Sequence, residues 1–186
     1  NYKKNLELLS KNYVYSKEME HDACGVGVIV STEGKKSREI VEHGIEALKA
    51  VWHRGAVDAD GKTGDGAGIH VEIPKDFFIE KIEVTGHDYD NAEICVGMIF
   101  LPRNDYSAQE SCKTIVESEL TKNNFSIYGW RQVPVNPKIL GQKALQTMPE
   151  IIQVLFKSND QNLLDKNLER KIYETRKKIE KKAFQL

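Results

Sequence analysis

The apolar residues of this chain fall into short runs of strand length, and amphipathic patterns of helical period lie between those runs. The runs and the helical patterns are grouped along the chain and do not alternate as regular βαβ units. Such grouping predicts an α+β fold in which short strands lie next to one another. Strands are expected over residues 25–31, 69–74, 94–101, 125–133 and 150–156, and helices over 37–52, 165–184 and after a capping box formed by Ser107 and Glu110.

The composition limits the partners that the chain is expected to have. Its 186 residues are 40% hydrophobic and 30% charged with a formal net charge of -1, so neither a nucleic-acid partner nor a membrane partner is expected. The N-terminal segment lacks the apolar core of a secretory signal, and we expect a cytoplasmic protein. Because the first residue is Asn1 and the last, Leu186, directly follows a charged helical pattern, we expect a fragment.

The cysteines and histidines give no sign of a metal centre. The three cysteines are widely spaced and include no Cys-x-x-Cys pair, which argues against a zinc ribbon and against a disulfide framework. His21 and His43 have no metal-ligand spacing to another histidine or cysteine, so no metal site is expected. Cys95 lies inside an expected strand and Cys112 on the apolar stripe of an expected helix, which indicates two small core residues.

Cys24 stands where a polar leader meets a β-branched run that begins with Gly25. A free cysteine beside a strand is most often a core residue. If the chain were cut before Cys24, however, one residue would carry both a thiol and a free α-amine. Such an amine has a pKa of roughly 8 and can accept a proton near neutrality. The position of Cys24 therefore suggests an N-terminal-nucleophile enzyme.

A glycine-rich stretch, Asp60-Gly61-Lys62-Thr63-Gly64-Asp65-Gly66-Ala67-Gly68, connects an expected helix to an expected strand. Its Gly61–Thr63 segment is similar to the end of a phosphate-binding P-loop, which makes a nucleotide-binding module an alternative. A P-loop requires a glycine where this chain has Ala56, and it runs from a strand into a helix. The glycines are better explained by tight turns and close backbone approach.

The tripeptide His53-Arg54-Gly55 precedes that stretch. It is explained either as the C-terminal cap of a helix with solvated cations, or as a site where the Arg54 guanidinium binds a carboxylate such as Asp58 or Asp65.

Together these motifs resemble the class II glutamine amidotransferase domain of the glutamate synthase large subunit. The resemblance covers nearly the whole chain, and the stretch from Asp60 to Gly68 is its most specific part. The motifs that carry it are Cys24-Gly25-Val26-Gly27, Ala50-Val51-Trp52-His53-Arg54-Gly55-Ala56, Asp60 to Gly68, Gly129-Trp130-Arg131-Gln132-Val133-Pro134 and the charged helix from Glu169 to Lys182.

The resemblance implies an N-terminal-nucleophile αββα sandwich, incomplete in this fragment. Residues 1–23 would be a propeptide, and residues 24–186 the N-terminal part of the amidotransferase domain. Cys24 would be the nucleophile that hydrolyses glutamine to glutamate and ammonia. Arg54 would hold the nucleophile loop, and the other residues implied to support that loop are Gly55, Gly64, Asp65 and Gly66.

In this family the ammonia reaches a synthase domain of the same polypeptide, which aminates 2-oxoglutarate. That site uses FMN, an iron–sulfur cluster and electrons from a small NADPH-oxidising subunit or from ferredoxin; no cofactor is expected in this fragment. The chain has no Asn-Gly pair, from which class II enzymes draw oxyanion donors, and no segment that grips the glutamine α-carboxylate. Substrate-binding residues are therefore expected after Leu186, and the fragment alone is expected to have negligible glutaminase activity. A catalytically silent interaction or regulatory domain is the remaining alternative.

Overall fold

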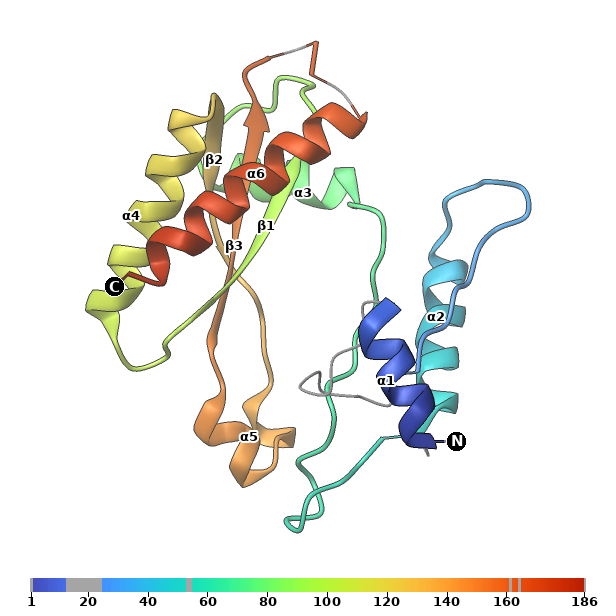
Figure 1. Ribbon diagram of the computed structural model, residues 1–186. Helices are drawn as coiled ribbons and strands as arrows, with labels where there is room; N and C mark the ends of the chain where they lie inside the picture. The colour runs from blue at the N-terminus through green and yellow to red at the C-terminus, as the bar shows by residue number, and fades with distance from the viewer. Residues whose placement is uncertain (1, 13–24, 53–54, 161, 164, 186) are drawn as a thin grey trace. The chain divides into compact units, whose positions relative to one another are not determined.

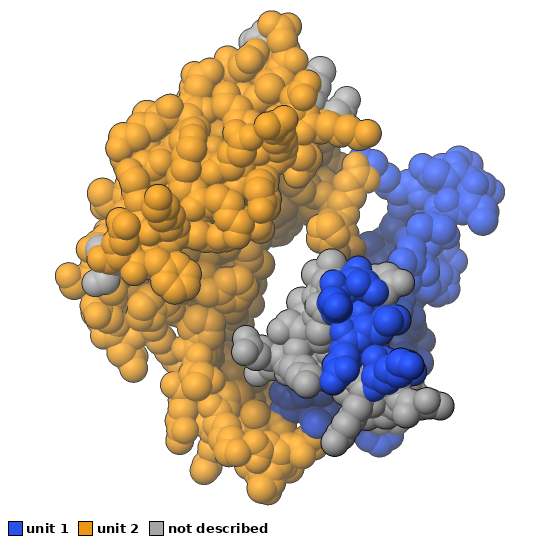
Figure 2. Space-filling model, viewed as in Figure 1, with its two compact units in different colours: residues 1–56, 64–69 blue, residues 57–63, 70–186 orange. Residues whose placement is uncertain are grey.

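The computed structural model describes residues 2–12, 25–52, 55–160, 162–163 and 165–185. The chain divides into two compact units, which Figure 2 shows in different colours. Unit 1 comprises residues 1–56 and 64–69, and unit 2 comprises residues 57–63 and 70–186. The described residues contain helices, 3₁₀ turns and antiparallel strands, so the expected α+β class is confirmed at that level.

The described residues of unit 1 include the helices α1 (Tyr2–Asn12) and α2 (Arg38–Ala50) (Figure 1). The side chain of Ser37 caps α2 by accepting a hydrogen bond of 3.4 Å from the backbone N–H three residues later. The helix expected over 37–52 is thus confirmed. It ends sooner than expected, because Val51 is its C-cap and its backbone N–H donates to the carbonyl of residue 49.

The strands expected at residues 25–31 and 69–74 are wrong for this structure. Neither segment is part of a strand, and their apolar side chains are exposed, with Val26 at 90% and Val28 at 79%. An apolar run shows that a segment needs to be buried, but a strand also needs a neighbouring strand with which to form hydrogen bonds. Among the described residues, these two segments have no such neighbour.

Unit 2 is built on a three-stranded antiparallel sheet with the order β1-β3-β2. The strands are β1 (Cys95–Leu101), β2 (Phe125–Gln132) and β3 (Glu150–Ser158), which confirms the three strands expected in these regions. The central strand β3 is apolar on both faces because both are covered: Phe156 packs on one side of the sheet and Leu155 on the other.

Helices α4 (Tyr106–Lys122) and α6 (Asp165–Ala183) pack against each other on one face of the sheet (Figure 1). The helix expected over 165–184 is therefore confirmed, and its apolar stripe faces the core as its spacing predicts. The capping box expected at Ser107 and Glu110 is wrong: Asp105 is the N-cap, and its carboxylate accepts from the N–H of Ala108 at 2.9 Å. Buried residues of this core are Cys95, Val116, Leu120, Phe125, Val154, Phe156 and Leu168.

A buried carboxylate ties these two helices together. Glu119 on α4 is only 4% exposed and accepts a hydrogen bond of 2.5 Å from the ammonium of Lys182 on α6, with Lys122 a further 3.6 Å partner. The hydrogen bond from Lys182 lowers the pKa of Glu119, so the carboxylate is ionised near neutral pH. A buried carboxylate is tolerated when a charged donor binds it. Removing that donor would leave an unpaired buried charge and would lower the free energy of unfolding.

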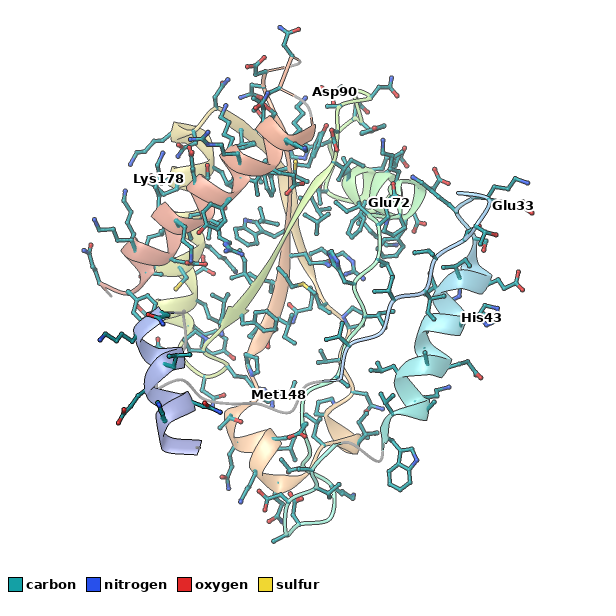
Figure 3. The ribbon with its side chains drawn as sticks, turned by 45° about the vertical axis from the view of Figure 1, so that its right-hand side comes forward. Glu33, His43, Glu72, Asp90, Met148 and Lys178 are labelled. Atoms are coloured by element: carbon teal, nitrogen blue, oxygen red, sulfur yellow. The ribbon has the colours of Figure 1, made fainter. Side chains whose placement is uncertain are left out.

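Helix α3 (Lys75–Val84) covers part of the opposite face of the sheet. It was not expected from the sequence. Asp90, which lies between α3 and β1 (Figure 3), forms an ion pair with Lys157 and accepts a hydrogen bond of 2.6 Å from the hydroxyl of Tyr128. These two contacts lower the pKa of Asp90 to about 2 and join this loop to β2 and β3. The buried residues of this second core are Phe78, Ile82, Ile94, Tyr128 and Leu155.

Strand β2 changes the faces of its side chains at a β-bulge between Ile127 and Gly129. Because of this extra residue, Ile127 and Trp130 lie on the same face although they are three residues apart, and Tyr128 lies on the other. Gly129 has φ +151°, and a Cβ built on it would lie 2.7 Å from the Cγ2 atom of Thr85. The hydroxyl of Thr85 also lies 2.8 Å from the carbonyl oxygen of Tyr128. The bulge therefore requires glycine.

Candidate functional site

Two of the residues implied by the resemblance, Cys24 and Arg54, lie outside the described residues. The others, Gly55, Gly64, Asp65 and Gly66, lie within or beside the glycine-rich stretch and are described. We call residues 56–65 the glycine-rich loop. We call residues 56, 64 and 65 its base and residues 58–63 its tip, and separate sets of contacts hold the two.

At the base of the glycine-rich loop, Asp65 binds the backbone of Ala56 twice. One carboxylate oxygen of Asp65 accepts from the N–H of Ala56 at 2.8 Å, and the N–H of Asp65 donates to the carbonyl of Ala56 at 3.2 Å. A Cβ built on Gly64 would lie 3.0 Å from the same carbonyl oxygen, so glycine fits this close approach. A Cβ built on Gly66, by contrast, meets no atom within 4 Å. Asp65 and Gly64 thus fix the backbone two residues after Arg54.

At the tip, the carboxylate of Asp60 organises the turn. One of its oxygens accepts from the backbone N–H groups of Lys62 and Thr63 at 2.9 and 2.7 Å, and the other accepts from the hydroxyl of Thr63 at 2.6 Å. These hydrogen bonds hold the pKa of Asp60 far below its ordinary value, and the bond from the Thr63 hydroxyl contributes most. Gly61 adopts φ +68°, a left-handed conformation that favours glycine.

The occupied amides of this turn argue against the nucleotide-binding alternative. A P-loop binds phosphate with free backbone N–H groups and a free hydroxyl. Here the amides of Lys62 and Thr63 and the hydroxyl of Thr63 already bind the Asp60 carboxylate. A phosphate would have to displace this carboxylate or lie beside a second negative charge. The Gly61–Thr63 segment is therefore a self-contained turn.

The tip also contacts the long connection between β2 and β3, which carries a 3₁₀ turn (Pro137–Ile139) and the short helix α5 (Gln142–Thr147). The ammonium of Lys143 lies 2.6 Å from a carboxylate oxygen of Asp58. The sequence analysis did not identify Asp60 or Lys143. The Asp-Gly-Lys-Thr pattern carries a local signal for the Asp60 turn, because aspartate readily accepts from N–H groups two and three residues on. No local signal connects residue 58 with residue 143.

Of the two cysteines interpreted as core residues, Cys95 lies in the core, whereas Cys112 is only partly buried. Cys95 is 5% exposed, and burial raises the pKa of its thiol to about 12, so it stays protonated and unreactive near neutral pH. Cys112 on α4 is partly exposed. Neither forms a disulfide. Within the described residues, no cluster of three or more His, Cys, Asp or Glu side chains has the arrangement to hold a metal ion.

In the part of the chain that the structure describes, no helix combines the length and the apolar character needed to cross a membrane.

Residues 24–186 match the family of class-II glutamine amidotransferases. The chain belongs to this family. It is 51% identical over 180 residues to the large chain of the NADPH glutamate synthase of Azospirillum brasilense, covering 97% of this chain and 12% of that protein. It is also 39% identical over 175 residues to the ferredoxin-dependent glutamate synthase of Pyropia yezoensis, and 40% identical over 163 residues to ferredoxin-dependent glutamate synthase 1 of Arabidopsis thaliana.

These matches cover 94% and 87% of this chain and 11% and 10% of the Pyropia and Arabidopsis proteins. The class-II amidotransferase chain described here therefore spans about a tenth of the length of the curated relatives that it matches. Both kinds of relative, NADPH-dependent and ferredoxin-dependent, are glutamate synthases by name.

Proposed function

We propose that this chain is the N-terminal part of the glutaminase domain of a glutamate synthase, with Cys24 as its nucleophile. The observation that carries the proposal is the 51% identity to a glutamate synthase large chain over nearly the whole of this chain. The family match begins at residue 24, which is Cys24 itself. That boundary supports the interpretation of residues 1–23 as a propeptide and residues 24–186 as domain.

The proposed reaction follows from the chemistry of an N-terminal cysteine. The Cys24 α-amine takes the thiol proton, and the thiolate attacks the side-chain carbonyl of glutamine to form a tetrahedral intermediate. The carbon–nitrogen bond breaks, ammonia leaves with the proton from the amine, and a thioester remains. Water then hydrolyses the thioester to glutamate and restores the thiol. The nucleophile loop would be positioned by Arg54, Gly55, Gly64, Asp65 and Gly66. The hydrogen bond from the Ala56 N–H to the Asp65 carboxylate supports this role.

The finer fold that we propose for the complete domain is the αββα sandwich of N-terminal-nucleophile hydrolases. The sheet of unit 2 supports it: α4 and α6 form a helix layer on one face, while Met98 and Phe100 of β1 are 52% and 62% exposed. A sheet with large apolar side chains exposed on one face is expected to pack against a further layer.

In the complete protein, we propose that the ammonia passes to an FMN-containing synthase domain of the same polypeptide, which aminates 2-oxoglutarate with reducing equivalents carried by an iron–sulfur cluster. We assign no described residue to these cofactors. Iron–sulfur clusters are bound by thiolates, whereas Cys95 is a core thiol with a raised pKa.

The higher identity to the NADPH-dependent relative supports a small NADPH-oxidising subunit over ferredoxin as the electron donor. The free Cys95 and Cys112 fit the reducing cytoplasm.

A glutamine analogue with an electrophile in place of the amide tests this proposal. In the full-length protein we expect it to label Cys24 and to leave Cys95 and Cys112 unmodified, with glutamine protecting Cys24. Peptide mass spectrometry locates the adduct. Cys95 is spared because its thiol is buried and protonated. Equal labelling of the three cysteines, or no protection by glutamine, would argue against Cys24 as the nucleophile.

A further inference from the structure

The first turn of α5 is capped by another part of the chain. Its N-cap residue, Gly141, has no side chain to bind the free N–H groups of the turn. Instead, the backbone N–H of Lys143 lies close enough to the Asp60 carboxylate to contribute to lowering its pKa, and the N–H of Ala144 lies 3.5 Å from the hydroxyl oxygen of Thr63. The tip of the glycine-rich loop therefore supplies the acceptors, one of them charged, that this helix end favours.

The contact is close and leaves no room at Gly141, which is buried. A Cβ built on Gly141 would lie 2.2 Å from the hydroxyl oxygen of Thr63 and 2.3 Å from a carboxylate oxygen of Asp60. It would also lie 2.5 Å from the backbone nitrogen of Thr63. A side chain at residue 141 would therefore move either α5 or the turn. The Lys143 ammonium adds an ion pair of 2.6 Å to Asp58 on the rim of the contact.

The held segment is continuous with the segment assigned to the nucleophile loop. Asp58, Asp60 and Thr63 contact the first turn of α5, and the backbone of residue 56 is hydrogen-bonded to Asp65. Residue 56 directly follows Arg54-Gly55. The hydrogen bonds between Ala56 and Asp65 restrict the backbone conformations open to Gly55, the residue directly before Ala56.

We propose that the α5 turn, residues 141–144, positions the glycine-rich loop for glutamine hydrolysis, with Gly141 and Lys143 as positioning residues. This inference rests on the proposed function. The turn lies in the β2–β3 connection, in which Figure 3 labels Met148 just after α5. Neither residue takes part in the bond-making steps; their effect is on the geometry of the loop.

The two residues differ in the size of their expected effects. The side chain of Lys143 is 65% exposed, and exposed ion pairs contribute little to the stability of a contact. Lys143→Met should therefore lower kcat for glutamine hydrolysis by only about threefold. Gly141→Ala forces a displacement of the turn, and displacements on the order of 1 Å lower rates by up to about a hundredfold. We therefore expect Gly141→Ala to lower kcat by tenfold or more. At residue 143, arginine in place of methionine should restore most of the activity that Lys143→Met loses.

The experiment uses the full-length enzyme and two assays: glutamine hydrolysis, and glutamate synthesis from added ammonia, which bypasses the glutaminase. The matched controls are Lys138→Met, an exposed lysine of the same connection, and Gly44→Ala, where a built Cβ meets no atom within 4 Å. We expect Gly141→Ala and Lys143→Met to have a lower kcat for glutamine hydrolysis and unchanged ammonia-dependent synthesis, while both controls keep both activities.

The inference is overturned if Lys143→Met and Gly141→Ala hydrolyse glutamine like their controls, or if Lys143→Met loses both activities in equal proportion. If Gly141→Ala loses both because it misfolds, the comparison of Lys143→Met, Lys143→Arg and Lys138→Met decides. Failure of the proposed function has a different signature: the wild-type full-length protein would not hydrolyse glutamine at all.

Discussion

The Cys24→Ser variant of the full-length protein is expected to lose glutamine hydrolysis by at least about a thousandfold, the scale on which removal of a covalent nucleophile reduces turnover. A serine hydroxyl is far less acidic than a thiol, so the adjacent α-amine cannot generate an effective nucleophile from it at neutral pH. Release of glutamate and ammonia from glutamine measures the loss.

Two comparisons make this result specific to Cys24. Glutamate synthesis from added ammonia should be unchanged in Cys24→Ser, because that reaction does not need the glutaminase. Cys112→Ser should retain glutamine hydrolysis, since Cys112 is a partly exposed residue of α4 that has no part in the proposed reaction. Full glutaminase activity in Cys24→Ser would contradict the assignment of the nucleophile.

The Gly129→Ala variant is expected to lower the free energy of unfolding of the sheet unit by about 3 kcal/mol. Overpacking a core position costs about 1–3 kcal/mol, and a backbone conformation that only glycine favours adds about 1–3 kcal/mol. The added methyl would overlap the side chain of Thr85, 2.7 Å away, at φ +151°. Urea unfolding followed by the fluorescence of Trp130, which adjoins the bulge, measures the change.

Gly86→Ala is the matched control for this prediction. Gly86 has φ +82°, but a Cβ built on it meets no atom within 4 Å. Its substitution should therefore show only the conformational cost, about 1 kcal/mol. If the variants at Gly129 and Gly86 were equally stable, the contact with Thr85 would not be what requires glycine at the bulge.

The sheet and its helix layer could be predicted from the sequence because each segment carries its own signal. β1, β2 and β3 are apolar runs of strand length, and α6 has apolar residues at helical spacing. The same signal failed for residues 25–31 and 69–74, since an apolar run does not identify its partner. The missed helices, α3 and α5, are short, and α5 is capped by residues that lie about 80 positions earlier in the chain, as the Ala144–Thr63 contact shows.

The candidate site likewise has one part that the sequence reveals and one part that it does not. Gly64 and Asp65 belong to a recognisable motif, and the structure gives both a role at the base of the loop. The contact between Gly141 and Asp60 depends on tertiary packing, and residue spacing does not reveal it. Cys24 and Arg54 are assigned from motif and family resemblance, and their roles stay predictions.

The mass of the large-subunit polypeptide in active enzyme tests the central claim most directly, because the proposed mechanism needs the free α-amine of Cys24. The account predicts a mature chain that begins at Cys24, with residues 1–23 removed. A fully active enzyme whose mature chain still carries the Ala23–Cys24 peptide bond would contradict it, since an acylated nitrogen cannot accept the thiol proton.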